Sequence, residues 1–323
     1  MKFKKILITG GAGFIGTNLT NHLLNTYPNI KIIIFDNFSN NYKHFKKKFS
    51  REIRLNKIKV LNYNLLNKKK LLIATKKTDL VFHLAANSDI SLAIENPLID
   101  FNGTLITSNL LECCRINKVK KIIYTSGSGI YGDNKNINIE NNIKDIKPIS
   151  FYGASKLACE SLMSAYSHMY DMNISVFRMA NIIGKYSTHG VIFDFLKKLK
   201  INSTKLVILG NGKQNKSYLH VSDLINAFFH IIKKQKKKYD IFNVATDELI
   251  TVKNISKIIF KIIKKNPKII YTGGKIGWKG DVSYIKLSNK KIKKLGWKYS
   301  FKTSEAVRQT ILENYDIYSK KIR

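Results

Sequence analysis

The chain lacks any apolar run long enough to cross a membrane. No run approaches the ~20 residues that span a bilayer, and the basic start at residues 1–5 is followed by only three apolar residues before Thr9. A secretory signal, which needs a longer apolar region, is therefore not expected. Cysteine is also scarce, and Cys113, Cys114 and Cys159 have neither metal-ligand nor redox spacing. We expect free thiols, no metal site and a cytoplasmic location.

Acidic residues are few, with 21 Asp and Glu against 57 Lys and Arg and a net charge of +36. Nucleic-acid or membrane-surface binding is one hypothesis for so basic a chain. However, the lysines are spread over all 323 residues, and no RNA-binding signature or zinc spacing accompanies them. We therefore expect solvated basic helix and turn faces, no specific nucleic-acid binding and no membrane insertion. The positive field favours the approach of an anionic substrate.

Apolar runs alternate with helical patterns over the first 180 residues. Strands are predicted at residues 6–8, 31–35, 58–61, 79–86, 120–126 and 174–178. Helices are predicted near 42–49 and at 69–76, 105–117 and 152–170. This alternation predicts an α/β fold with a doubly wound parallel sheet of the Rossmann type, whose ligands bind beyond the carboxyl ends of the strands.

The pattern loosens from residue 181 onward. Helices are predicted at 191–200, 221–234, 255–265 and 304–319, with short strands at 206–209 and 241–244, the latter returning to the main sheet. We predict a Rossmann domain over 1–180 with a return near 219–246. A smaller, interleaved C-terminal substrate lobe covers 181–218 and 247–323.

A glycine-rich turn, Gly10-Gly11-Ala12-Gly13-Phe14-Ile15-Gly16, follows the first strand. Gly10 permits a tight turn, Gly13 admits a phosphate close to the backbone, and Gly16 lets the following helix pack on the strand. The second strand ends in Asp36, twenty residues after Gly16. An acid there accepts hydrogen bonds from ribose hydroxyls and repels a 2′-phosphate, which favours NAD over NADP. Glycines also mark ordinary turns, so the glycines alone would not predict a dinucleotide site. The prediction depends on the strand before them, the helix after them and Asp36.

Tyr152 and Lys156 lie four residues apart, on one face of a predicted helix. A lysine cation favours the phenolate form of a nearby tyrosine. Tyr152 is therefore the predicted general base, and Lys156 is also expected to hold ribose hydroxyls. In many helices the same spacing only places a tyrosine in the core and a lysine in solvent.

With these motifs, the chain resembles the extended short-chain dehydrogenase/reductase family, in its sugar-nucleotide epimerase/dehydratase branch, and is most similar to UDP-glucose 4-epimerases. The resemblance also rests on segments 83–86, 125–132, 178–181, 210–214, 219–223 and 280–282. It implies NAD contacts at Gly10, Gly13, Phe14, Ile15, Gly16, Asp36, Asn37, Asn64, Leu65, Leu84, Ala85, Ala86, Tyr152 and Lys156. It implies substrate contacts at Asn181, Lys216, Tyr218, Lys279 and Asp281.

The sequence departs from the family at three places. Gly127 stands where the family has its catalytic Ser or Thr, and either Ser128, which we favour slightly, or Ser126 is expected to supply the hydroxyl, unless water does. Lys216 and Lys279 replace two phosphate-binding arginines, so charge is kept without the bidentate fork. The family's Asn-x-x-Gly-Thr is shortened to the stretch 102–104.

The turn around Gly127 also indicates which reaction the chain catalyses. Where 4,6-dehydratases have Asp-Glu, this chain has Ser128 and Gly129. The resemblance therefore implies NAD-dependent C4 epimerisation of a nucleoside-diphosphate hexose, of the UDP-glucose/UDP-galactose type. The alternatives are a related dehydratase, a 4-keto-sugar reductase and a non-catalytic NAD-binding regulator. The resemblance further implies a homodimer that pairs helices 105–117 and 152–170 into a four-helix bundle.

Overall fold

A computed structural model describes residues 3–39, 42–87, 90–277 and 280–319. These residues form two compact units that are interleaved along the chain. The first unit comprises residues 1–126, 154–177 and 231–241, and the second comprises 127–153, 178–230 and 242–323. The grouping differs from the expected domain boundaries chiefly at 127–153, which pack in the second unit. Those boundaries stay a prediction.

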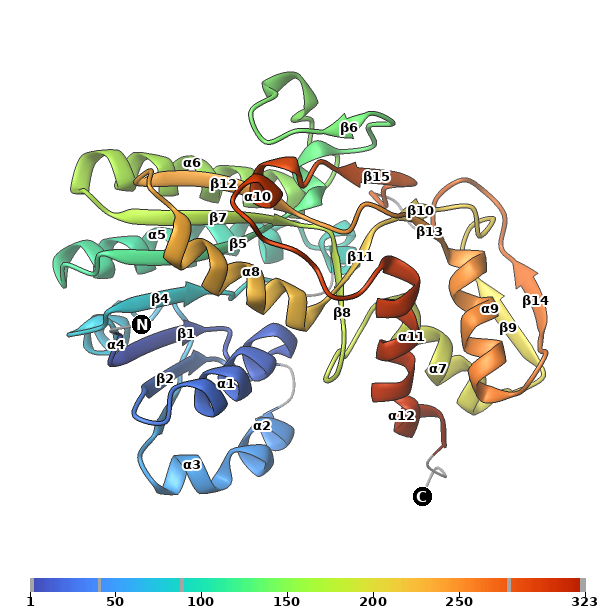
Figure 1. The fold of residues 1–323 in the computed structure, drawn as a ribbon, viewed down its shortest axis with the longest axis horizontal. Helices are drawn as coiled ribbons and strands as arrows, with labels where there is room; N and C mark the ends of the chain where they lie inside the picture. Colours follow the sequence, from blue (N-terminus) through green and yellow to red (C-terminus); the bar gives the residue numbers. More distant parts are fainter. Residues whose placement is uncertain (1–2, 40–41, 88–89, 278–279, 320–323) are drawn as a thin grey trace. The chain divides into compact units, whose positions relative to one another are not determined.

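A seven-stranded parallel sheet runs through the first unit in the order β12-β7-β5-β4-β1-β2-β3, and β5, β7 and β12 end in residues of the second unit (Figure 1). Its strands are β1 (Lys5–Thr9), β2 (Lys31–Asp36), β3 (Ile58–Asn62), β4 (Leu80–His83), β5 (Lys121–Gly127), β7 (Asn173–Met179) and β12 (Tyr239–Val244). The predicted doubly wound Rossmann-type sheet is confirmed, as is the return of the 241–244 strand to it.

The central strands are apolar on both faces, as a parallel sheet covered on both sides requires. In β1, Ile6, Leu7 and Ile8 are fully buried, and Leu7 lies in register with Ile33 of β2 and Val81 of β4. Because the strands are parallel, their carboxyl ends meet at one edge, which is where a dinucleotide binds in this type of sheet.

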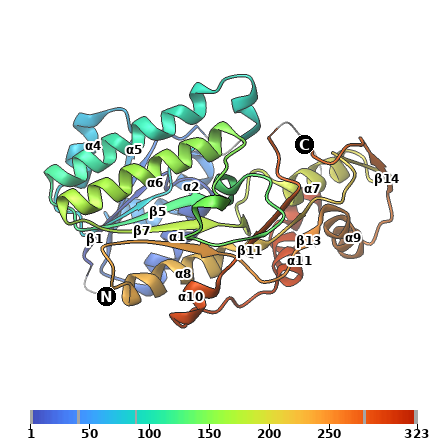
Figure 2. The ribbon, with the colours of Figure 1, turned by 90° about the horizontal axis from the view of Figure 1, so that it is seen from above.

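Three helices, α4 (Lys68–Thr75), α5 (Leu98–Ile116) and α6 (Phe151–Tyr170), lie on one side of this sheet, and α1 (Phe14–Thr26) lies on the other (Figure 2). Leu71, Leu110 and Met163 of the three helices share a core with Leu7 and Val81 of the strands. Two short helices, α2 (Tyr42–Lys48) and α3 (Ser50–Arg54), follow β2. Among the described residues, no helix combines the length and apolar character needed to cross a membrane.

Two boundaries in the first unit were predicted wrongly. The helix expected at 105–117 begins earlier, at Leu98, because Pro97 at its N-cap has a φ of −58° that already suits a helical turn. The strand expected at 79–86 ends at His83, where the chain leaves the sheet toward the glycine turn. The first correction matters for the site, since it adds one buried residue, Asp100, at the start of α5.

The second unit has its own core, formed mainly by three helices. Helix α9 (Val252–Ile263) buries Ile255, Ile259 and Ile263, which recur every four residues. These side chains pack with α7 (Val191–Ile201), α11 (Thr303–Glu313) and the parallel pair β9 (Lys205–Ile208) and β14 (Lys268–Tyr271). Two smaller sheets complete the unit: β13 (Ile250–Thr251), β10 (Asn215–Lys216), β15 (Tyr284–Leu287) and β6 (Ile137–Asn138); and β11 (Tyr218–His220) with β8 (Asn181–Ile183).

The helix predicted over 304–319 is broken at Asn314 into α11 and α12 (Tyr315–Ser319). The Asn314 amide donates to the carbonyl oxygens of Gly184, at 3.1 Å, and Thr310, at 2.8 Å. A partner 130 residues away therefore ends the helix, and this part of the prediction was wrong. The helix predicted at 221–234 is confirmed as α8 (Val221–Lys234).

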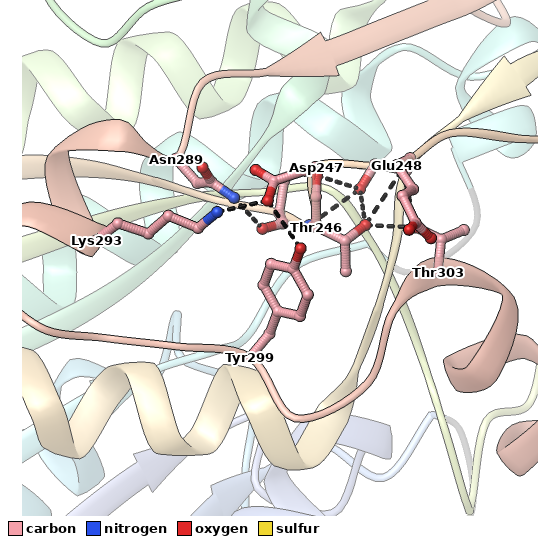
Figure 3. A network of polar contacts seen from close by, with 9 residues as sticks. Thr246, Asp247, Glu248, Asn289, Lys293, Tyr299 and Thr303 are labelled. Carbon is pink, nitrogen blue, oxygen red and sulfur yellow. Dashed lines mark hydrogen bonds and ion pairs between the residues drawn. The ribbon is translucent and has the colours of Figure 1, made fainter.

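A polar network fixes the connection between β12 and β13 to the C-terminal segment of the second unit. Figure 3 shows Lys293, from α10 (Lys290–Lys294), and Tyr299 directed at the Asp247 carboxylate, and the Tyr299 hydroxyl donates to it at 2.8 Å. The Thr303 hydroxyl also donates to the Glu248 carbonyl at 2.8 Å. The Asn289 amide adds a bond to the Ala245 carbonyl at 2.9 Å.

Candidate active site

The glycine turn between β1 and α1 has the shape of a pyrophosphate cradle. Gly10 has a φ of +66°, and a Cβ there would lie 2.7 Å from the backbone N of Ala85. A Cβ on Gly16 would lie 2.5 Å from the Cα of Gly11. Only glycine therefore lets the turn pass against the chain after β4 and lets α1 pack on the turn.

The N-terminus of α1 is open to an anion. Its N-cap residue, Gly13, makes no side-chain cap, and the first turn carries no acidic residue. The next side chains, Phe14 and Ile15, are half-buried. Uncapped N–H groups and the positive end of the helix dipole favour a phosphate at this place.

Asp36 joins the end of β2 to the glycine turn. Its Oδ2 accepts a hydrogen bond from the Ala12 N–H at 3.0 Å, and its Oδ1 accepts one from the Phe38 N–H at 2.7 Å. Burial raises the pKa of this carboxyl group, and the two backbone bonds lower it. The carboxylate is thus held at the edge where an adenosine ribose would lie in this fold.

The other predicted cofactor residues follow neighbouring strand ends. Asn37 and Asn64 are exposed, and the Asn64 side-chain oxygen accepts from the Leu66 N–H at 2.9 Å within its own turn. Leu65 is buried, and the residues after β4 become more exposed along the chain: Leu84 and Ala85 are half-buried and Ala86 is exposed. Their contacts with NAD stay predictions.

Lys156 is a buried lysine at the same edge of the sheet. Its Nζ donates to the Thr125 carbonyl of β5 at 2.7 Å and lies 4.9 Å from the centre of the Tyr124 ring. Burial lowers the pKa of Lys156 to about 8. The ammonium is therefore largely retained at neutral pH.

His83 lies close to this lysine and is fully buried. Its Nδ1 is 2.7 Å from the Thr9 hydroxyl and its Nε2 is 2.9 Å from the Thr107 hydroxyl. Burial, with the Lys156 charge as a smaller cause, lowers the pKa of His83 to about 3. The imidazole is therefore neutral and serves as a polar spacer between β1 and α5.

In the second unit, Tyr152 lies against a turn made largely of glycine. A Cβ on Gly127 would be 3.4 Å from Cε1 and 3.5 Å from the hydroxyl oxygen of Tyr152. A Cβ on Gly129 would be 3.6 Å from its Cδ1, and the Gly129 carbonyl leaves no room for a side chain at Gly153. Contacts of 3.4 Å or more are ordinary packing distances, so a small side chain at position 127 would fit.

The two candidate hydroxyls flank Gly127. Ser126, the last residue of the first unit, is fully buried, and its hydroxyl has no hydrogen-bond partner within the described ranges. Ser128 is half-buried and opens the short helix η2 (Ser128–Tyr131) of the second unit. Both serines therefore stay candidates for the hydroxyl that Gly127 lacks.

A buried network fixes the end of this turn. The Tyr131 hydroxyl donates to the Asn243 side-chain oxygen at 2.8 Å and lies 3.0 Å from Nη1 of Arg178. The same guanidinium donates to the Glu140 carbonyl at 3.1 Å, and the Asn243 N–H donates to Oε1 of Glu140 at 2.8 Å. Burial raises the pKa of Tyr131 to about 12, so its phenol stays protonated. The network ties the 127–131 turn to β7 and β12.

The predicted substrate residues of the second unit come partly together. Nζ of Lys216 lies 2.6 Å from Oδ1 of Asp281, with both side chains mostly buried. Burial, together with the Asp281 charge, raises the pKa of Tyr218. Asn181 lies on β8, whose partner strand β11 carries Tyr218, and its amide donates to the Ser217 carbonyl at 3.3 Å. Lys279 lies outside the described residues.

Sequence reasoning missed one residue, Asp100. It is 2% exposed, whereas Asn102, the expected family position, is exposed. The stretch 100–104 reads Asp-x-x-Gly-Thr, so the spacing of the family motif is kept with an acid in first place. Counting back from Gly103 would have found it.

A family model describes residues 6–245 of this chain as NAD dependent epimerase/dehydratase. The chain belongs to that family. NAD is its cofactor, and the glycine turn and Asp36 fit that group. The resemblance seen in the sequence is thereby confirmed at the level of the family.

Similar proteins of this family include both epimerases and dehydratases. A putative UDP-glucose 4-epimerase of Methanocaldococcus jannaschii is 29% identical over 95% of this chain and 97% of its own. A dTDP-D-glucose 4,6-dehydratase of Dictyostelium discoideum is 32% identical over 80% of this chain and 62% of its own. A solved UDP-galactose 4-epimerase is 31% identical, with a TM-score of 0.84 over 97% of this chain and 99% of its own. Membership in the family is thus compatible with both epimerisation and dehydration.

Substitution of Gly10 tests the pyrophosphate cradle. Gly10→Ala should weaken NADH binding at least tenfold and lower thermal stability, because it combines a strained φ, costing about 1–2 kcal/mol, with a collision against Ala85. Fluorescence titration with NADH and a melting curve measure the two effects. Gly273→Ala is the matched control, since Gly273 has a φ of +87° with nothing within 4 Å of its Cβ position. Equal NADH affinity in both variants would contradict the cradle.

Proposed function

We propose that the protein catalyses reversible epimerisation at C4 of a nucleoside-diphosphate hexose, of the UDP-glucose/UDP-galactose type. The observation that carries this proposal is the turn beside Tyr152. Its two positions that correspond to the acid and base of 4,6-dehydratases hold Ser128 and Gly129. Elimination of water requires such a pair, whereas oxidation and reduction at C4 do not. Relatives named as UDP-sugar 4-epimerases support the substrate class.

In the proposed reaction, Tyr152 acts as the general base that takes the proton of the 4-hydroxyl. NAD supplies the acceptor for the C4 hydride and the donor that returns it, so no net redox change occurs. The transient 4-keto sugar turns before the hydride returns, and Tyr152 gives the proton back. Lys156, one helical turn further along α6, contributes a positive charge that favours the phenolate.

Gly127 contributes no hydroxyl to this chemistry. We assign that contact with the 4-hydroxyl to Ser128, with Ser126 as the alternative and an ordered water as the third. The space beside the Tyr152 hydroxyl supports a water or a small shift of the turn, since a Cβ at position 127 would fit there.

The substrate's nucleotide and diphosphate are assigned to Asn181, Lys216, Tyr218, Lys279 and Asp281. The Lys216–Asp281 pair supports this assignment, because it places a cation and a hydroxyl acceptor side by side in a largely buried setting. A lysine binds phosphate as a point charge and not as a fork. We expect diphosphate binding with less directional selectivity than an arginine would give.

A homodimer in the cytoplasm is also part of this proposal. On α5, Leu98, Phe101 and Leu105 are 65%, 56% and 43% exposed and follow one helical face. The neighbouring α6 exposes small side chains at Ala154, Ala158, Ser161 and Ala165. An apolar stripe beside a stripe of small residues suits close packing of two helix pairs into a four-helix bundle.

Product analysis tests the reaction. Purified protein incubated with UDP-glucose, and separately with GDP-, CDP- and dTDP-sugars, should yield the C4 epimer of at least one of them at constant mass, as followed by NMR. Loss of water would instead identify a dehydratase, which the similarity to dTDP-D-glucose 4,6-dehydratases keeps as the second candidate. Stoichiometric consumption of NADH with a 4-keto sugar would identify a reductase.

Tyr152→Phe should reduce turnover about 10²–10⁴-fold, because it removes the proton acceptor. NADH affinity should stay within a few fold of wild type. Tyr166→Phe is the control on the same helix, since the Tyr166 hydroxyl bonds to Glu112, and it should keep full turnover. Wild-type turnover in Tyr152→Phe would remove Tyr152 from the mechanism.

Phe101→Glu should convert a dimer into a monomer, because a charge on the α5 stripe would be buried without a partner. Light scattering should give twice the 37.0 kDa of one chain for wild type and one chain's mass for the variant. Ile73→Glu, at an exposed apolar residue of α4, should leave the mass unchanged. An unchanged mass for Phe101→Glu would place any dimer contact elsewhere.

A further inference from the structure

One part of the second unit carries lysines that no acid balances. Two stretches of the sequence, 195–222 and 249–277, contain neither aspartate nor glutamate. They include most of α7 and all of β9, α9 and β14, and these elements pack around one core, in which Leu199, Leu206 and Ile259 are buried. Figure 1 shows α9 alongside β9 and β14. Two acid-free stretches that are far apart in the sequence therefore cover the same part of the second unit.

The last turn of α9 presents lysines on its exposed side. Ile259 and Ile263 face the core, whereas Lys261, Lys264 and Lys265 are exposed. Lys261 and Lys265 are four residues apart, which places them roughly 6 Å apart along the helix axis. The end of α9 thus carries three cations on one side.

The strands β9 and β14 add two further cations. They run parallel, and Lys205 lies directly in register with Lys268. Both lysines are exposed, so two ammonium groups lie on the same face of the strand pair. Like charges at directly opposed positions of a sheet are destabilising, and a bound anion would offset that cost.

The chain connections bring these lysines and an exposed apolar side chain together. The Lys268 N–H donates to the Thr204 carbonyl at 2.9 Å. Lys265 and Ile201 each lie three residues before this contact, on the two joined segments. Ile201, the last residue of α7, is 77% exposed. An exposed isoleucine therefore lies close to the lysines.

The acids of the neighbouring helices are engaged elsewhere. Asp194 pairs with a lysine of its own helix, α7, at 2.7 Å. On α11, Glu305 accepts a backbone N–H at 2.8 Å, and Glu313 lies 3.2 Å from His220. Within the described part of the chain, no ion pair joins an acid to the lysine face, which we define as Lys205, Lys261, Lys264, Lys265 and Lys268.

We propose that the lysine face, with Ile201 beside it, is a docking surface for an anionic lipid bilayer, on which the protein lies without inserting a helix. Lipid headgroups present phosphate and carboxylate groups as a fluid array, which suits separate ammonium point charges. An exposed apolar side chain beside them can enter the boundary between headgroups and acyl chains.

Nucleic acid fits this surface less well than a bilayer. The two acid-free stretches contain no arginine, so the planar group that both pairs with phosphate and stacks on bases is missing. Among their described residues, Tyr271 is the exposed aromatic, at 37%, and it lies at the opposite end of β14 from Lys268. Bases would therefore find little to stack on near the lysines.

Sedimentation with lipid vesicles tests the docking surface. At a salt concentration of about 0.15 M, where charges are screened beyond about 8 Å, wild-type protein should bind vesicles of phosphatidylcholine containing about one-third phosphatidylserine. It should not bind vesicles of phosphatidylcholine alone. Raising the salt to about 1 M should release the protein, because the screening length falls to about 3 Å. Failure to bind the anionic vesicles at the lower salt concentration would overturn the proposal.

The triple variant Lys261→Glu/Lys265→Glu/Lys268→Glu should lower the vesicle partition coefficient about 100-fold, because each lysine near the bilayer adds to the attraction. The matched control is Lys233→Glu/Lys236→Glu/Lys237→Glu, which changes the net charge equally on exposed lysines of the first unit. It should keep the partition coefficient within about threefold of wild type, since distant charges are screened. Equal losses in the two variants would show that overall charge and not the lysine face attracts the protein, and would overturn the proposal.

Two further measurements complete the test. Ile201→Ser should weaken vesicle binding by a smaller factor than the lysine variant, whereas Ile73→Ser, at an exposed apolar residue of α4, should not change it. Melting curves check that all the variants fold. Binding of a fluorescent single-stranded oligonucleotide that is lost in the lysine-face variant, without binding of wild type to anionic vesicles, would identify nucleic acid as the partner and overturn the assignment to a bilayer.

Discussion

A lysine ammonium held away from water is the constraint on which the first unit's site depends. Lys156 gains a carbonyl oxygen and an aromatic face, yet burial still lowers its pKa to about 8. Everything that meets it must then be neutral or acidic. The imidazole beside it is neutral because it is buried, and two carboxylates lie within electrostatic range. A basic group at any of these places would lower the pKa of Lys156 further.

The second unit meets a different requirement, which is to hold a phenol without crowding it. Tyr152 lies along the backbone of the 127–129 turn, where side chains are nearly absent. The turn itself gains rigidity further along, from the buried hydrogen bonds of Tyr131, Arg178 and Asn243. Rigidity is thus provided by buried hydrogen bonds away from the Tyr152 ring, and the part of the turn that touches the ring carries almost no side chains.

The parts of the site that depend on local sequence could be predicted. The strand–glycine–helix order specifies the cradle within sixteen residues, and Tyr152 and Lys156 are related by helix periodicity alone. The parts that depend on distant partners could not. Asp281 meets Lys216 across 65 residues, and the end of α11 depends on the Gly184 carbonyl. Asp100 was missed because the family motif was read as shortened to 102–104, with Asn102 as its first residue.

The two hydroxyls on His83 have a consequence for proton order. The Thr107 hydroxyl donates to the Gly103 carbonyl at 2.7 Å, so its hydrogen is committed and it must accept from Nε2–H of the ring. Nδ1 is then bare and accepts from the Thr9 hydroxyl. The hydrogen bonds therefore all point the same way, from β1 into α5: Thr9 donates to His83, His83 donates to Thr107, and Thr107 donates to the Gly103 carbonyl. Its single tautomer fixes the direction of the ring's dipole at the edge of the sheet where a dinucleotide binds in this type of fold.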